Sequence, residues 1–194
     1  MPSLAHGPAE GHHSGIREIA NEAIRTPGAI RLDVGQPNFR TPDHIGEAGK
    51  RAIDEGKTYY THTQGLLSLR EKLAAKLARV NGIHVTPDRI ACTPGGVGAI
   101  AAVFASVLED GDEVLLPDPG WPNFAMMLPW TDAKGVFYPC RPEAGFQPDL
   151  DALARLITPR SKLVVVNSPT NPTGAIHPRQ TIEKPVELAQ RHNI

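Results

Sequence analysis

The residues that could do chemistry gather in three short segments rich in Gly, Pro and Asn. The first is the Gly-rich turn Gly95-Gly96-Val97-Gly98, the second surrounds Trp121, and the third contains Asn171. Glycines let a ligand approach the backbone closely, and the N-terminus of a following helix attracts an anion. An indole ring offers a flat stacking surface, and an amide donates hydrogen bonds. Together the three segments predict a binding site for a flat ligand that carries a phosphate.

Each of these segments is expected to follow a strand of one mostly parallel sheet. Apolar runs predict strands over residues 90–93, 113–116, 136–138 and 162–167. These strands alternate with predicted helices, which indicates an α/β fold with right-handed crossovers. The carboxyl ends of parallel strands meet at one edge, where open α/β sheets bind their ligands. We therefore expect the three segments to converge at that edge.

Apolar residues at helical spacing predict the helices that position these strands. The predicted helices cover residues 16–24, 43–56, 66–80, 99–108, 149–157 and 181–193. Ser14 is the expected N-cap of the first helix. The apolar stripe of helix 66–80 predicts a core-facing helix, and helix 99–108 is expected to be buried. Pro185 lies inside the last helix, so we expect a kink or a later helix start there.

Each candidate segment also has an alternative interpretation. A Gly-rich turn often only connects two elements, Trp121 is equally suited to a core, and Asn171 could form an Asx-turn. A rival ligand interpretation reads Gly96, Gly98 and Ala101 as a dinucleotide fingerprint, with Asp118 as its ribose-binding acid. That fingerprint usually opens its domain, whereas a long stretch of chain precedes Gly96 here. It also leaves Trp121 and Asn171 without a role.

Composition restricts the possible functions. The chain has 194 residues and a formal net charge of -1, which gives no indication of a nucleic-acid or membrane-surface ligand. Its two cysteines have neither metal nor redox spacing, so no metal site is predicted and a reducing compartment is favoured. Residues 1–14 are expected to form a disordered tail without the apolar core of a signal peptide. A cytoplasmic location is the resulting expectation.

The motifs occur in the order and spacing of a known family. The chain resembles fold-type I, class I/II aminotransferases that use pyridoxal 5'-phosphate. The resemblance runs from about residue 16 to residue 194 and depends on five segments, which are Val34–Phe39, Tyr59–Arg70, Gly95–Ala99, Gly120–Asn123 and Asn171–Gly174. It implies the large domain of the aspartate aminotransferase-like fold, with a mostly parallel sheet. The implied activity is amino-group transfer between an amino acid and a 2-oxo acid.

The resemblance also implies roles for individual residues. The backbone of Gly95, Gly96 and Val97 is expected to hold the cofactor phosphate, although many relatives have Ser or Thr where Val97 stands. Trp121 is expected to stack on the pyridine ring. Asn171 is expected to bond the phenolic oxygen of the ring, and both it and Trp121 are expected to lie near the substrate.

Two further roles follow from the first two segments of the resemblance. The main chain of Gly35 is expected to border the substrate carboxylate. Tyr60 is expected to reach the cofactor phosphate of a neighbouring subunit, which implies a homodimer.

The same resemblance implies that part of the enzyme lies beyond this chain. Family members are about twice as long, and their Schiff-base Lys follows well after the Asn-Pro-Thr-Gly turn. After that turn the only lysine here is Lys184, outside any matching motif. We therefore expect the isolated chain to be inactive, with residues 15–45 packing on a missing small domain and residues 46–194 forming the first half of the cofactor-binding domain. A related lyase or synthase, an NAD(P)-dependent oxidoreductase and a non-catalytic remnant remain alternatives.

Overall fold

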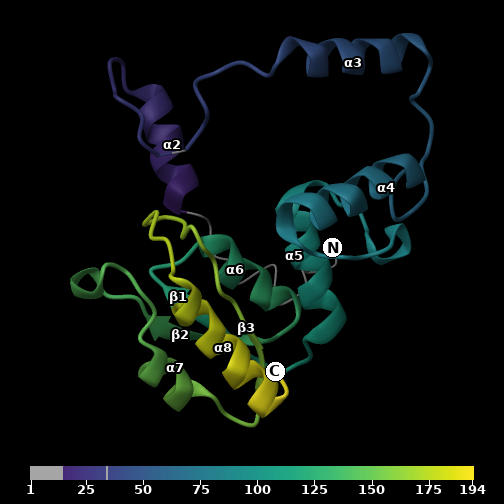
Figure 1. The fold of residues 1–194 in the computed structure, drawn as a ribbon. Coiled ribbons are helices and arrows are strands. Elements are labelled where there is room, and N and C mark those ends of the chain that lie inside the picture. Colours follow the sequence, from purple (N-terminus) through teal and green to yellow (C-terminus); the bar gives the residue numbers. More distant parts are fainter. Residues whose placement is uncertain (1–14, 34) are drawn as a thin grey trace, which may run out of the picture. The chain divides into compact units, whose positions relative to one another are not determined.

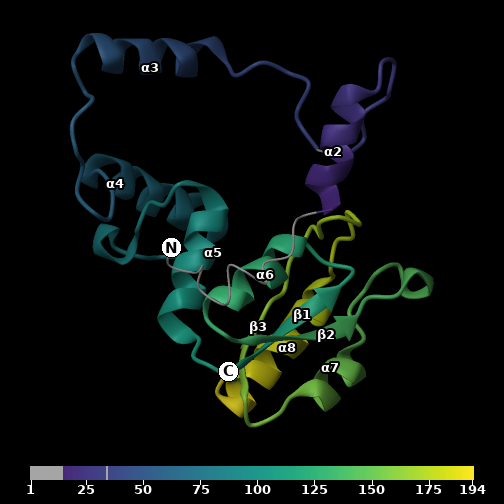
Figure 2. The ribbon, with the colours of Figure 1, turned by 180° about the vertical axis from the view of Figure 1, so that it is seen from behind.

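The computed structural model describes residues 15–33 and 35–194, and these form two compact units. One unit covers residues 15–96 and the other covers residues 97–194. The expected N-cap Ser14, the expected tail 1–14 and Val34 of the first resemblance segment lie outside the described residues. Figure 1 shows the elements of each unit in sequence colours, and Figure 2 shows them from behind.

The unit 97–194 contains a parallel sheet of three strands in the order β2-β1-β3. The central strand is β1 (Glu113–Asp118), flanked by β2 (Lys134–Pro139) and β3 (Ser161–Val164). Leu115 of β1 pairs with Val136 of one neighbour and Val164 of the other. The sheet confirms the α/β class and the parallel arrangement.

Helices cover both faces of this sheet (Figures 1 and 2). On one face, α5 (Gly95–Val107) and α6 (Pro122–Met127) pack against Val114 and Leu116. A short 3-10 helix, η3 (Leu128–Trp130), follows α6.

The opposite face carries α7 (Leu150–Leu156) and α8 (Arg179–His192), which pack against Leu115 and Tyr138. Val114, Leu115 and Leu116 point to alternate faces because successive strand residues do so. All three are buried on a central strand, which explains the unbroken apolar run in the sequence. A further 3-10 helix, η4 (Pro142–Ala144), precedes α7.

The unit 15–96 is helical in its described part. Its helices are α2 (Gly15–Arg25), α3 (Asp43–Asp54) and α4 (Leu67–Lys76), followed by the π-helical turn η1 (Leu77–Asn81) and the 3-10 turn η2 (Pro87–Arg89). The buried side chain of Arg70 ties α4 to two loops. Its Nε donates to the carbonyl of Gly65 at 3.2 Å, and its Nη1 donates to the carbonyl of Pro87 at 2.9 Å. The buried guanidinium of Arg70 is thus paired with backbone carbonyl groups and not with a carboxylate.

The strand predicted over residues 90–93 is wrong. This segment is extended but belongs to no strand, and the N–H of Cys92 donates to the carbonyl of Gln64 at 2.9 Å. An apolar, β-prone run forms a strand only where a neighbouring strand pairs with it. The other strands were located correctly, although β3 ends at Val164 and not at Asn167.

Two expectations about burial are also wrong. The stripe on helix 66–80 is largely exposed, with Leu69 at 44% and Val80 at 57% of full exposure. Helix α5 is buried on one face only, since Phe104 faces the core while Val103 remains 51% exposed. Apolar spacing identifies the face that prefers burial, but a neighbour must be present to cover it.

Helix α8 does not start late as Pro185 suggested. It begins at Arg179, directly after Pro178, and continues through Pro185. The Pro185 ring is fully buried beside Leu163 and Val164, and this burial offsets part of the lost helical hydrogen bond. None of the helices described in residues 15–33 and 35–194 has the length and apolarity needed to cross a bilayer.

Candidate functional site

Two of the three candidate segments leave the sheet at the same edge. Trp121 follows the carboxyl end of β1, and Asn171 follows the carboxyl end of β3, which pairs directly with β1 in parallel. The chain passes from the C-terminus of α5 through a short connection to the start of β1, and α5 packs along that strand. The N-terminal end of α5 therefore points toward the same carboxyl edge. Open α/β sheets bind ligands at this edge.

The start of α5 is open to an anion. Gly95 has a φ of 74°, a conformation that favours glycine, and its N–H donates to the carbonyl of Thr93 at 2.8 Å. A Cβ atom added at Gly96 would meet nothing within 4 Å. The N–H groups of a first helical turn lack intrahelical partners and carry partial positive charge. The arrangement suits a phosphate, with Val97 contributing only its backbone.

This turn lacks the context of a dinucleotide fingerprint. Such a fingerprint connects a strand directly to a helix, and the segment ahead of Gly95 is not a strand. Asp118, the acid that the rival interpretation requires, lies exposed at the end of β1. The oxidoreductase interpretation therefore has little structural support.

Trp121 is held at the entrance of α6 by two local constraints. A Cβ atom on Gly120 would overlap the carbonyl oxygen of Pro117, so only glycine allows this close turn. Pro122 begins α6 directly after the indole. The Trp121 ring meets Phe124 edge-to-face, with centroids 5.3 Å apart and an interplanar angle of 88°. Trp121 is half-buried, so it packs on the core while part of its ring stays accessible.

Asn171 sits exposed on a tight turn after β3 (Ser161–Val164). Its backbone N–H donates to Oδ1 of Asn167 at 3.2 Å. Thr170 closes the turn through its backbone, donating to the carbonyl of Ala175 at 2.9 Å and accepting from the N–H of Gly174 at 2.7 Å. The Asn171 side chain is therefore presented at the edge by a turn with its own hydrogen bonds.

A buried polar cluster that the sequence analysis missed supports this turn. Thr170 and His177 are only 5% and 7% exposed. The Thr170 hydroxyl lies 3.2 Å from Nε2 of His177 and donates to the carbonyl of Asn167 at 3.0 Å. Nδ1 of His177 lies 3.0 Å from Oε1 of Gln147. The only available signal was the mixture of polar types, since Gln147 is far from the others in sequence.

Tyr138 adds a second support. Its hydroxyl donates to the carbonyl of Val165 at 2.7 Å and so anchors the chain between β3 and Asn167. Burial raises the pKa of Tyr138, which keeps the hydroxyl protonated as a donor. Burial also raises the pKa of the Cys140 thiol, and it lowers the pKa of His177. Cys140 is thus an unreactive core residue and not a nucleophile.

Gly35 and Tyr60 belong to the other unit, residues 15–96. Both are exposed, and Tyr60 is among the most exposed aromatic side chains of the described residues. Tyr60 precedes a loop in which Gln64 is connected to residues 88–92, accepting the N–H of Cys92 through its carbonyl and donating through its side chain to the carbonyl of Asp88.

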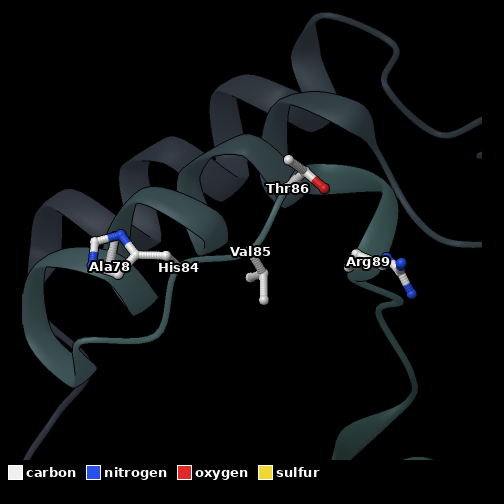
Figure 3. Close-up of a pocket in the computed structure, with 5 residues that line it drawn as sticks. All are labelled: Ala78, His84, Val85, Thr86 and Arg89. Carbon is white, nitrogen blue, oxygen red and sulfur yellow. The ribbon is translucent and has the colours of Figure 1, made fainter.

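A depression in the same unit contains none of the sequence-predicted residues. It is lined by Ala78, His84, Val85, Thr86 and Arg89 (Figure 3). Figure 3 shows the imidazole of His84 and the guanidinium of Arg89 at opposite ends of the row. Because these groups do not converge, we assign no ligand to it. Within residues 15–33 and 35–194, no group of three or more His, Cys, Asp or Glu residues could hold a metal.

The chemistry of the carboxyl edge fits pyridoxal 5'-phosphate. The N-terminus of α5 offers N–H donors to a phosphate. Trp121 offers an aromatic face, and the exposed amide of Asn171 can donate to a ring oxygen. The phosphate, the aromatic face and a ring oxygen of the cofactor thus each have one partner.

Known proteins resemble the chain in sequence over most of its length. Residues 27–194 match the family model described as aminotransferase class I and II. The aspartate/prephenate aminotransferase of Thermus thermophilus is 42% identical over 164 residues, which make up 84% of this chain and 43% of that protein. The aspartate aminotransferase of Pyrococcus horikoshii is 36% identical over 181 residues, or 93% of this chain and 46% of that protein.

Solved structures show the same relationship. Aspartate aminotransferase from Thermus thermophilus with maleate matches with a TM-score of 0.95 and 38% identity, over 100% of this chain and 52% of that one. Alanine aminotransferase from Pyrococcus furiosus matches with a TM-score of 0.93 and 32% identity, over 99% of this chain and 50% of that one. The chain thus spans about half the length of the relatives that it matches.

Proposed function

The chain belongs to the class I and II aminotransferase family, and from this membership we propose that the complete protein carrying it is a pyridoxal 5'-phosphate-dependent aminotransferase. Its reaction transfers an amino group from an amino acid to a 2-oxo acid. One observation supports this most strongly. The Trp121 loop and the Asn171 loop leave two directly paired parallel strands at one sheet edge.

Each residue at this edge binds a different part of the cofactor. The backbone at Gly95, Gly96 and Val97 binds the phosphate, and no hydroxyl assists there because Val97 is apolar. Trp121 stacks on the ring and excludes water from one side of it. The Asn171 amide donates to the phenolic oxygen and orients the ring in its plane. When bound, the cofactor supplies an electron sink that permits proton removal from the amino acid Cα.

This unit holds the cofactor but offers no lysine at the edge to take that proton. The lysines of residues 97–194 are Lys134, Lys162 and Lys184. Lys134 and Lys162 lie at the starts of β2 and β3, which is the opposite edge of the sheet. Lys184 lies on α8 and pairs with Glu187 at 3.5 Å. We therefore assign proton transfer to a residue beyond this chain, and we expect the 194-residue polypeptide to be inactive by itself.

The unit 15–96 contributes one residue to substrate binding and one to the contact with a second subunit. The main chain of Gly35 borders the substrate carboxylate, and Tyr60 reaches the phosphate of a neighbouring subunit in a homodimer. The full exposure of Tyr60 supports such an intersubunit role.

Two wider assignments belong to the same proposal. Residues 15–45 pack on a small domain and residues 46–194 form half of the cofactor domain, which agrees with the exposed Ile19 and Ile24 of α2. A cytoplasmic location is consistent with Cys92 and Cys140 as free thiols.

The test uses the complete protein with added pyridoxal 5'-phosphate. We expect a visible absorption band from the bound cofactor and formation of glutamate from 2-oxoglutarate with an amino acid donor. Aspartate, alanine and phenylalanine are the donors to compare, because the relatives are named for aspartate, alanine and aromatic amino acids. Failure to bind the cofactor would overturn the assignment. Cofactor binding with elimination of a substituent from the substrate, and no transfer of the amino group to 2-oxoglutarate, would indicate a lyase.

A further inference from the structure

We propose that His177 is a positioning residue that fixes the cofactor-facing turn of Asn171 through Thr170 and Asn167. This inference rests on the proposed function, since it assumes that Asn171 contacts the cofactor. The three residues form a continuous path of contacts below the exposed turn. His177 itself lies too deep to reach a ligand at the edge, being only 7% exposed.

The path begins at the imidazole. Nε2 of His177 lies 3.2 Å from the Thr170 hydroxyl, and this hydroxyl also contacts the carbonyl of Asn167 at 3.0 Å. The side chain of Asn167 then accepts the backbone N–H of Asn171 at 3.2 Å. The backbone carbonyl of Asn167 thus contacts Thr170, and its side-chain oxygen accepts the backbone N–H of Asn171.

The other side of the imidazole connects to a different segment. Gln147 donates through Nε2 to the carbonyl of Ile176 at 3.2 Å, which directs its Oε1 toward His177. Oε1 lies 3.0 Å from Nδ1 of His177, so Nδ1 carries the ring proton in this arrangement. Nε2 is then an acceptor, and the single hydroxyl proton of Thr170 is shared between Nε2 and the carbonyl of Asn167. The backbone N–H of His177 donates to Oγ of Ser168 at 2.9 Å. The imidazole therefore links the turn to the segment ahead of α7.

Nothing else in the described structure replaces this link. All buried side-chain polar atoms of the described residues have hydrogen-bond partners, so the cluster is complete as it stands. Removing the imidazole would leave Oε1 of Gln147 without its partner, and it would leave the hydroxyl of Thr170, which is only 5% exposed, with the carbonyl of Asn167 alone. A buried polar group without a partner is costly, so the turn is expected to rearrange.

Two variants distinguish the contact that His177 makes through Nδ1 from the contact that it makes through Nε2. In His177→Asn the side-chain amide can replace Nδ1 and keep the bond to Gln147, but it cannot reach Thr170. In His177→Gln the longer amide can replace Nε2 and keep the contact with Thr170. A merely structural role would lower the melting temperature in both variants and leave cofactor affinity equal. A positioning role through Thr170 predicts that cofactor affinity falls in His177→Asn and is rescued in His177→Gln.

The experiment measures the Kd of pyridoxal 5'-phosphate by protein fluorescence in the complete protein, together with the melting temperature of each variant without cofactor. We expect His177→Asn to raise the Kd about fivefold to tenfold and His177→Gln to raise it less than twofold. Equal Kd values in the two variants would overturn the inference. Asn171→Ala is the control for the proposed function. If it leaves the Kd unchanged, Asn171 does not contact the cofactor, and the role proposed for Asn171 fails independently of His177.

Discussion

The side-chain oxygen of Asn167 accepts the backbone N–H of Asn171 at 3.2 Å. This bond closes the turn that presents Asn171, and it joins the last extended residues after β3 to the candidate site. Asn167 is half-buried while Asn171 is exposed, so one residue serves the fold and the other is free for a ligand. The conformation of the exposed amide therefore depends on its partner four residues earlier.

Replacing Asn167 by Ala is expected to weaken cofactor binding without a direct contact being lost. The N–H of Asn171 loses its acceptor, and a typical hydrogen bond contributes about 1 kcal/mol, which corresponds to roughly fivefold in Kd. Asn167→Asp is the matched control because it keeps an oxygen at the same place. Fluorescence titration with pyridoxal 5'-phosphate measures both. Equal losses in the two variants would contradict the role of this acceptor.

Gly96→Ala is expected to separate folding from cofactor binding. The new methyl group meets no atom within 4 Å, and alanine is a better helix former than glycine, so stability is unchanged or slightly raised. The same methyl group occupies the space in front of α5 where the phosphate is proposed to lie. We expect the Kd of the cofactor to rise at least tenfold.

Gly46→Ala provides the control for that variant. Gly46 lies within α3, and a Cβ atom there also meets nothing within 4 Å. The stability of Gly46→Ala is expected to be unchanged or slightly raised, as for Gly96→Ala, while its Kd for the cofactor equals that of the parent protein. Unaltered affinity in Gly96→Ala would show that the phosphate does not approach this helix.

The two tryptophans of the chain allow the stacking role to be tested optically. Trp121 is half-buried at the sheet edge, whereas Trp130 is 67% exposed on η3. Quenching of protein fluorescence by bound cofactor is expected to fall strongly in Trp121→Phe and to persist in Trp130→Phe. Trp121→Phe is also expected to weaken binding by about 1 kcal/mol, since the smaller ring stacks less well. A reversed pattern of quenching would place the ring elsewhere.

The sequence located those parts of the fold that depend on local pattern. Val114, Leu115 and Leu116 form an unbroken apolar run because they lie on a central strand that is buried on both faces, and this run was recognisable in the sequence. The run 90–93 looked similar, yet strand formation depends on a partner strand that no local pattern reveals. In the same way, the stripe with Leu69 and Val80 showed which helix face is apolar but not whether a neighbour covers it.

The same limit applies to the candidate site, where the loop residues could be predicted from the sequence and the buried residues that support them could not. Trp121, Asn171 and the Gly-rich turn were visible because loop residues carry function at the ends of parallel strands. Thr170 and His177 were not visible, because their importance comes from Gln147 contacting the imidazole across thirty positions of sequence. Buried polar clusters are set by tertiary packing, and each member alone has an unremarkable neighbourhood in the sequence.

Acid is expected to destabilise the protein partly through His177. Burial lowers the pKa of this imidazole below its ordinary value of about 6.5, so the unfolded chain binds its proton more readily than the folded chain does. Stability from the neutral ring is therefore fully present above pH of about 6.5 and is lost as the pH falls through the lowered pKa. Urea unfolding across this range measures the slope.

His177→Gln removes the titrating group while keeping a polar side chain. Its unfolding free energy is expected to fall less steeply than that of the parent protein as the pH is lowered from 7 toward 5. Parallel slopes for the two proteins would show that His177 does not titrate differently in the folded and unfolded states.

The outer edge of β3 (Ser161–Val164) is expected to make the isolated 194-residue polypeptide prone to association. Among the described residues, the strand order β2-β1-β3 leaves β3 without a partner on one side. Apolar grooves flank it on both faces, one lined by Val166 and α8 and the other by Val103 and α5. An unpaired strand bordered by apolar surface is a template for pairing with another chain.

We expect this polypeptide to sediment as aggregates or to unfold without a cooperative transition, and Val166→Lys to increase the soluble fraction by placing a charge at the edge. Val80→Lys is the control, because Val80 is 57% exposed but lies on η1, in the unit that has no strand among its described residues. A monomeric, soluble polypeptide with one sharp thermal transition would show that the exposed edge is tolerated. Equal gains from both lysines would instead attribute the association to general surface hydrophobicity.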